Sequence, residues 1–116
     1  MRCVIILNDP PYGSERAYNG LRLAHALLKN DPDTNVTVFL MADAVVCAKQ
    51  GQKTPDGYYN IERMLKRVNA KGRVLLCGTC MDARGLTDAE LMENARRSTM
   101  EELAGEIGQS DKALVF

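Results

Sequence analysis

Four runs of apolar residues recur along the chain, and each has the length of a β-strand. The runs are continuous rather than alternating, which is typical of parallel strands that helices cover on both faces. They occupy residues 3–7, 36–41, 74–77 and 113–116. A fifth candidate, Ala95–Ser98, is weaker because Arg96 and Arg97 are too polar for a central strand. The pattern therefore predicts a buried parallel sheet.

Helical periodicity fills the segments between these runs. Apolar side chains share one face at residues 17, 21, 24 and 28, and again at residues 61, 64, 65 and 68. Capping-box patterns at residues 87–90 and 98–101 predict two further helix starts. Ser14 is expected to cap the first helix, and Asp43 a short helix over residues 44–50. The alternation of strands and helices predicts one α/β domain over residues 1–116, a three-layer α/β/α sandwich with a parallel sheet.

Charge and composition narrow the class of protein. Fifteen basic and fifteen acidic residues cancel, so the chain carries no electrostatic footprint for nucleic acid or an anionic membrane. No apolar run approaches the ~20 residues of a membrane span, and the first residues do not read as a signal peptide. We therefore expect a cytoplasmic protein whose four cysteines are thiols in a reducing compartment.

The carboxyl ends of the predicted strands carry the residues with chemical potential. In open α/β sheets, ligands bind at this edge. The first strand is followed by Asn8, Asp9 and Tyr12, the second by Asp43 and the third by the Cys77–Cys80 turn. The turn-rich segment 51–57 is long enough to move over such a site. We expect all of these groups to surround the two cysteines.

The C-x-x-C pair of Cys77 and Cys80 is open to four interpretations: a metal site, a cycling disulfide, a nucleophilic thiol, or packing. Structural zinc takes four ligands, usually in two pairs, and the chain has a single C-x-x-C. We therefore predict no metal and no other cofactor. Cys77 ends a strand, where N–H groups of the next turn, with help from Arg84, are expected to lower its pKa. Cys80 lies about one helical turn further on and can reach back to it.

Several stretches resemble the DsrE/DsrF-like family of sulfur-relay proteins, and most closely its YchN-type branch. They are PYGSE at 11–15 with LRLA at 21–24, FLMADAV at 39–45, GQK at 51–53 with Gly57-Tyr58 and Asn60-Ile61, CGTC at 77–80 with Asp82, Arg84 and Gly85, and DKALVF at 111–116. The resemblance implies five parallel strands, including Ala95–Ser98, and a homo-oligomer, either a trimer or a hexamer. It also implies a cysteine after the third strand that accepts sulfane sulfur as a persulfide, and Cys77 corresponds to that position.

Two functions follow as hypotheses. The first is a small sulfur carrier or sulfurtransferase-like protein, with Cys77 as the persulfide acceptor and Cys80 as an auxiliary thiol that releases the sulfur by closing a disulfide. Its partners would be protein donors and acceptors of sulfur, and further copies of the chain, because an apolar content of 46% is high for one small core. The alternative is a non-enzymatic, homo-oligomeric binding or interaction module, in which the cysteines are structural or bind a metal weakly.

Overall fold

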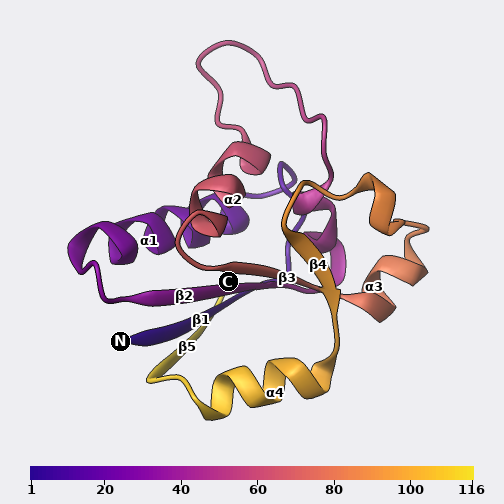
Figure 1. Cartoon of the computed structure of the whole chain (residues 1–116). Coiled ribbons are helices and arrows are strands. Elements are labelled where there is room, and N and C mark those ends of the chain that lie inside the picture. Colours follow the sequence, from indigo (N-terminus) through magenta and orange to yellow (C-terminus); the bar gives the residue numbers. More distant parts are fainter.

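A computed structural model describes all residues from 1 to 116 and contains one sheet of five parallel strands. The strand order is β4-β3-β2-β1-β5. Because all strands point the same way, their carboxyl ends form one edge of the sheet, on the right of Figure 1. The strands are β1 (Arg2–Leu7), β2 (Asn35–Leu40), β3 (Arg73–Cys77), β4 (Ala95–Ser98) and β5 (Lys112–Val115). The predicted fold class is confirmed, including the strand at Ala95–Ser98.

Helices cover the two faces of the sheet unequally. The helices α1 (Arg16–Asn30) and α2 (Ile61–Asn69) lie on one face, and α4 (Met100–Gly108) lies on the other (Figure 1). The short helix α3 (Gly78–Ala83) and the 3₁₀ turns η1 (Ala42–Ala48) and η2 (Asp88–Glu90) follow the strands near the carboxyl edge. None of the helices is long and apolar enough to cross a membrane.

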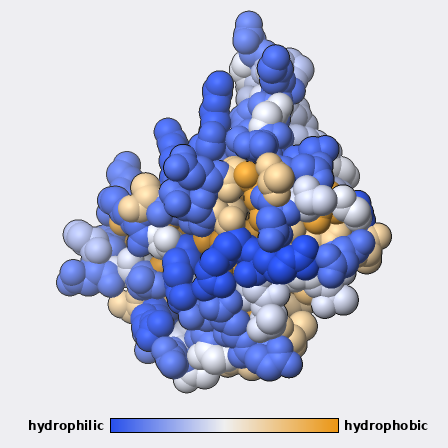
Figure 2. All heavy atoms as spheres, turned by 45° about the vertical axis from the view of Figure 1, so that its right-hand side comes forward, coloured by the Kyte–Doolittle hydropathy of each residue, from blue (hydrophilic) through white to orange (hydrophobic).

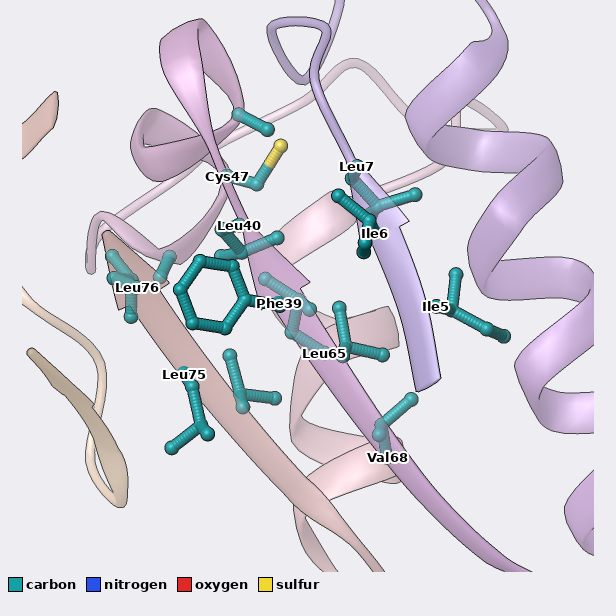
Figure 3. Packing of buried hydrophobic residues seen from close by; sticks show 14 of the residues in the cluster. Ile5, Ile6, Leu7, Phe39, Leu40, Cys47, Leu65, Val68, Leu75 and Leu76 are labelled. Atoms are coloured by element: carbon teal, nitrogen blue, oxygen red, sulfur yellow. The ribbon is translucent and has the colours of Figure 1, made fainter. Parts of the chain in front are cut away.

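The central strands are held by a continuous apolar core. Every residue of β1 and β2 after the first is buried, as is every residue of β3 after Arg73. Figure 3 shows Phe39 and Leu40 of β2 packed among side chains from β1, β3 and α2. Each fully buried side chain of this size stabilises the fold by about 1.5–3 kcal/mol. The strand ends, and the loops that leave them, therefore start from fixed positions.

The fifth strand corrects the expectation that all apolar runs are buried on both faces. β5 pairs only with β1 and forms an edge of the sheet, and Val115 in it is 66% exposed. The polar β4 occupies the other edge, where Arg96 and Arg97 reach solvent. Edge strands tolerate polar side chains because only one side of the strand is paired. Composition therefore located β5 but overestimated its burial, and it indicated β4 only weakly because the polar residues there suit an edge and not the centre of a sheet.

Two predicted helix starts are shifted, and a third lies where predicted but begins a shorter element. α4 begins at Met100, and its cap is Thr99, which accepts from the backbone N–H of Glu102 at 3.1 Å. The expected cap, Ser98, is still part of β4 and its hydroxyl donates to the Glu102 carboxylate. The box at residues 87–90 begins only a three-residue 3₁₀ turn. Likewise η1 starts at Ala42 with Met41 at the cap position, so Asp43 lies inside its first turn.

Candidate thiol site

Cys77 stands at the junction between β3 and α3. It is the last residue of the strand, pairs with Ser98 in the register of β4, and is also the N-cap of α3. Its sulfur accepts a hydrogen bond from the backbone N–H of Cys80, with 3.4 Å between nitrogen and sulfur. The sulfur therefore takes the position that a serine or aspartate oxygen takes at many helix N-termini.

Hydrogen bonds stabilise the thiolate form of Cys77. Burial opposes ionisation, since the residue is only 8% exposed. Hydrogen bonds to the sulfur outweigh this effect of burial and lower the pKa of Cys77. They come from the Cys80 side chain, from the backbone of Cys80 and Thr79, and from the Thr79 side chain. None of these main causes is a cation, which means that the short helix, rather than Arg84, favours the thiolate.

Cys80 has the opposite balance. It is half-buried, and burial together with the neighbouring Cys77 raises its pKa. The backbone N–H of Ala42 donates to its sulfur at 3.3 Å. Ala42 has a φ of 51°, a left-handed conformation that costs a non-glycine residue roughly 1–2 kcal/mol. The more acidic thiol is thus Cys77, and the more accessible one is Cys80.

Asp43 and Arg84 lie beside Cys80, as the sequence predicted for residues near the pair. Arg84 Nε donates to Asp43 Oδ1 at 2.8 Å, and its Nη1 donates to the Cys80 carbonyl at 3.1 Å. This ion pair ties η1 to α3 across the carboxyl edge. The charge of Arg84 lowers the pKa of Cys80, although other groups outweigh it.

Asn8 and Asp9 have their hydrogen-bonding partners elsewhere along the same edge. The Asn8 amide donates to the carbonyl of Phe116 at 3.2 Å and so joins the ends of β1 and β5. The Asp9 carboxylate accepts from the Ser14 hydroxyl at 2.6 Å, and Ser14 in turn accepts from the first N–H of α1 at Arg16. The N-cap position itself is taken by Glu15 and not, as predicted, by Ser14. These bonds hold the loop after β1 against α1 and do not involve either thiol.

Tyr12 anchors the 51–57 segment instead of facing the cysteines. Its hydroxyl donates to Gln52 Oε1 at 2.5 Å and accepts from the backbone N–H of Ile61 at 3.1 Å. Gln52 also donates from its amide to the carbonyls of Cys47 and Lys49. The base of the segment is therefore fixed, while its remaining residues project above α2 at the top of Figure 1.

The other two cysteines are core residues. Burial raises the pKa of Cys3, and it raises that of Cys47 to about 12. Figure 3 draws Cys47 with Leu7 and Leu40, and its thiol donates to the Asp9 carbonyl at 3.7 Å. No three His, Cys, Asp or Glu side chains are placed together to hold a metal ion. The single histidine, His25, contacts the Met64 carbonyl between α1 and α2, so its ring is committed to helix packing.

A cleft of about 520 Å³ opens beside Cys77, and most of its wall was not predicted from the sequence. One side is α3; the other is the end of β4 and the start of α4. Its lining residues are Cys77, Gly78, Thr79, Asp82, Arg97, Ser98, Thr99, Met100 and Glu101. The parallel pairing of β4 with β3 brings residues 97–101 here, because it places Ser98 next to Cys77. Figure 2, which turns this side of the molecule forward, shows a largely hydrophilic surface around a hydrophobic area.

Comparison with known proteins gives a consistent match over the chain. The model of the DsrE/DsrF-like family matches residues 1–116. The chain is 41% identical to protein YchN of Escherichia coli K12, over 99% of this chain and 98% of that protein. The crystal structure of E. coli YchN superposes with a TM-score of 0.95, covering 100% of this chain and 99% of the other. A more distant relative, sulfurtransferase TusD of Salmonella typhi, is 30% identical over 76% of this chain and 70% of its own length.

Proposed function

Because this chain belongs to the DsrE/DsrF-like family, we propose that it is a single-domain sulfur carrier in which Cys77 holds sulfane sulfur as a persulfide. The observation that carries this proposal is the 3.4 Å hydrogen bond from the Cys80 N–H to the Cys77 sulfur. A thiol stabilised as a thiolate beside an open cleft has the two properties that a nucleophile requires. The name of the relative TusD, a sulfurtransferase, agrees with this chemistry.

The loading step is a thiolate attack on a sulfur–sulfur bond. The Cys77 thiolate attacks the outer sulfur of a donor persulfide, R–S–SH, to give Cys77–S–SH, while the donor leaves as the thiolate R–S⁻. One S–S bond forms and one breaks, and no proton transfer is needed. The site has no histidine near the thiol, since the only one of the chain lies between α1 and α2. Sulfur transfer fits such a site better than acyl transfer, which needs a general base.

Cys80 is suited to discharge the sulfur. Its thiolate would attack the inner sulfur of Cys77–S–SH, forming a Cys77–Cys80 disulfide and releasing HS⁻. An external dithiol would then reduce the disulfide and restore both thiols. Without Cys80, the persulfide sulfur leaves only when the thiol of an acceptor protein attacks it.

The chain is also proposed to act as a homo-oligomer, a trimer or a hexamer, in the cytoplasm. Large apolar side chains are exposed away from the Cys77 cleft at Tyr58 and Val115, and closed oligomers commonly bury such surface. We expect light scattering at micromolar concentration to give a multiple of the 12.8 kDa chain mass. Val115→Lys on the edge strand should shift the mass downwards, because a lysine opposes strand pairing at an edge. A monomeric wild type would refute this part of the proposal.

Whole-protein mass spectrometry tests the carrier function. The chain is incubated with a hydropersulfide and excess donor is removed. We expect a gain of one sulfur atom that dithiothreitol reverses, and fragmentation of the tryptic peptide 74–84 should place it on Cys77. A chain that gains no sulfur, or gains it only at Cys3 or Cys47, is not a carrier of this kind.

A further inference from the structure

The cleft beside Cys77 has an excess of negative charge. Three carboxylates lie in or at the rim of the cleft, on Asp82, Asp88 and Glu101, and the single cation among them is Arg97. The start of α4 adds about half a positive charge. The sum remains negative before the Cys77 thiolate is counted.

The charge of Arg97 is already committed to protein groups. Its Nη1 lies 3.0 Å from Asp82 Oδ1 and donates to the Gly78 carbonyl at 3.0 Å, and its Nε donates to Asp88 Oδ1 at 3.2 Å. The glycine of the C-G-T-C turn makes room for this arrangement, since a Cβ at Gly78 would lie 2.9 Å from Arg97 Cγ. Two carboxylates therefore already offset the charge of this guanidinium before any anionic ligand approaches.

Glu101 supplies a carboxylate that no basic side chain pairs with. It lines the cleft from the first turn of α4, is exposed, and takes part in none of the ion pairs of the chain. The next guanidinium along the edge, on Arg84, is paired with Asp43 beside Cys80. No free cation therefore lines the approach to the Cys77 sulfur.

We propose that the charge of this cleft selects which sulfane donors react with Cys77. Neutral or cationic donors react, such as a persulfide on an aminothiol or on a basic peptide. Small anionic donors of the thiosulfate type are excluded. The inference rests on the proposed function in taking Cys77 as the reacting thiol. With thiosulfate the step would give Cys77–S–S⁻ and sulfite, SO₃²⁻, so a dianion has to approach a thiolate between carboxylates. With an aminothiol persulfide the incoming ammonium is attracted by the same carboxylates.

Alkylation measures this selectivity without any transfer of sulfane sulfur. Iodoacetamide is neutral and iodoacetate anionic, and both react with the same thiolate, so the ratio of their rates cancels the thiolate fraction. Fragmentation of peptide 74–84 reports how fast Cys77 is alkylated by each reagent. At low salt, we expect the ratio of the iodoacetamide rate to the iodoacetate rate at Cys77 to exceed the same ratio in a free CGTC peptide by about 5-fold or more. Glu101→Gln should lower the ratio by about 2-fold and Glu101→Lys further, and added salt should reduce it. Asp33→Asn, an exposed carboxylate in the turn before β2, is the matched control and should leave it unchanged.

The two proposals fail in different ways. A ratio equal to that of the peptide, unaffected by the Glu101 variants, overturns charge selection even if Cys77 loads sulfur. A raised ratio that Glu101→Lys abolishes supports charge selection, whether or not a donor loads sulfur. Absence of sulfur loading from every donor would overturn the carrier function instead. If both hold, cysteamine persulfide should load the wild type faster than thiosulfate, and Glu101→Lys should narrow the difference.

Discussion

The backbone N–H of Cys80 donates to the sulfur of Cys77, and this contact is one of the hydrogen bonds that favour the Cys77 thiolate and so make the two thiols unequal. The nitrogen–sulfur distance is 3.4 Å, within the range for a sulfur acceptor. The bond exists because β3 ends at Cys77 and α3 starts at the next residue, so the first free N–H groups of the helix point back at the side chain that precedes it. The C-x-x-C spacing brings the Cys80 side chain to the same place.

Native alkylation should follow this inequality. The pKa of Cys77 is lowered from 9.0 and that of Cys80 is raised, so with limiting iodoacetamide near pH 7 we expect Cys77 to be labelled first, despite its lower exposure. Its rate should reach half its maximum below pH 9.0, and Cys80→Ala should move that midpoint upward by removing the side-chain hydrogen bond. Cys3 and Cys47 should react only after unfolding, because both are buried with raised pKa values. Faster labelling of Cys80 would mean that access outweighs acidity.

The strained backbone at Ala42 gives a second test. Its φ of 51° suits glycine, so Ala42→Gly is expected to leave the free energy of unfolding unchanged or to raise it by up to about 1 kcal/mol. Ala26→Gly, on the exposed side of α1, is the control and should lower it by about 1 kcal/mol. Urea unfolding of both variants measures the difference. An equal loss in both would show that position 42 does not hold a left-handed conformation in solution.

Glu102 should contribute to stability in a defined pH range. Hydrogen bonds from Arg96 and Ser98 lower its pKa from 4.5 to about 2. The folded state therefore binds this proton less readily than the unfolded state, so the contribution is complete above pH 4.5 and is lost as the pH falls towards 2. Because the pair is partly exposed, we expect Glu102→Gln to cost about 1 kcal/mol at pH 7 and to change little at pH 2. Glu101→Gln, which removes an unpaired neighbour, should show no such pH dependence in thermal unfolding.

The sequence predicted the core of this fold better than its edges. Continuous apolar runs located β1, β2 and β3 because these strands are buried on both faces, where hydrophobicity alone decides the residue type. The run at residues 113–116 also located β5, but its burial was misjudged, and the pattern indicated β4 only weakly, since the two edge positions follow from strand order and not from composition. The polar Arg96 and the exposed Val115 are both accommodated there.

The thiol pair was found from its motif, whereas the cleft wall was not. Cys77 and Cys80 are close in sequence, and the strand–helix junction fixes their geometry locally. Arg97 and Glu101 reach the same place only through the pairing of β4 with β3, a long-range relation that no short motif encodes. The partners of Asn8 and Tyr12 were likewise unpredictable, because their hydrogen bonds go to Phe116 and Gln52, far away in the chain.

Sulfur loading of two single variants tests the assignment of Cys77 most directly. Cys77→Ser and Cys80→Ser are incubated with the same hydropersulfide as the wild type, and the mass of each chain is followed over time. We predict that Cys77→Ser gains no sulfur, and that Cys80→Ser gains one sulfur atom and keeps it longer than the wild type, because no internal thiol can displace it as HS⁻. Loading preserved in Cys77→Ser and lost in Cys80→Ser would contradict the assignment and make Cys80 the carrier.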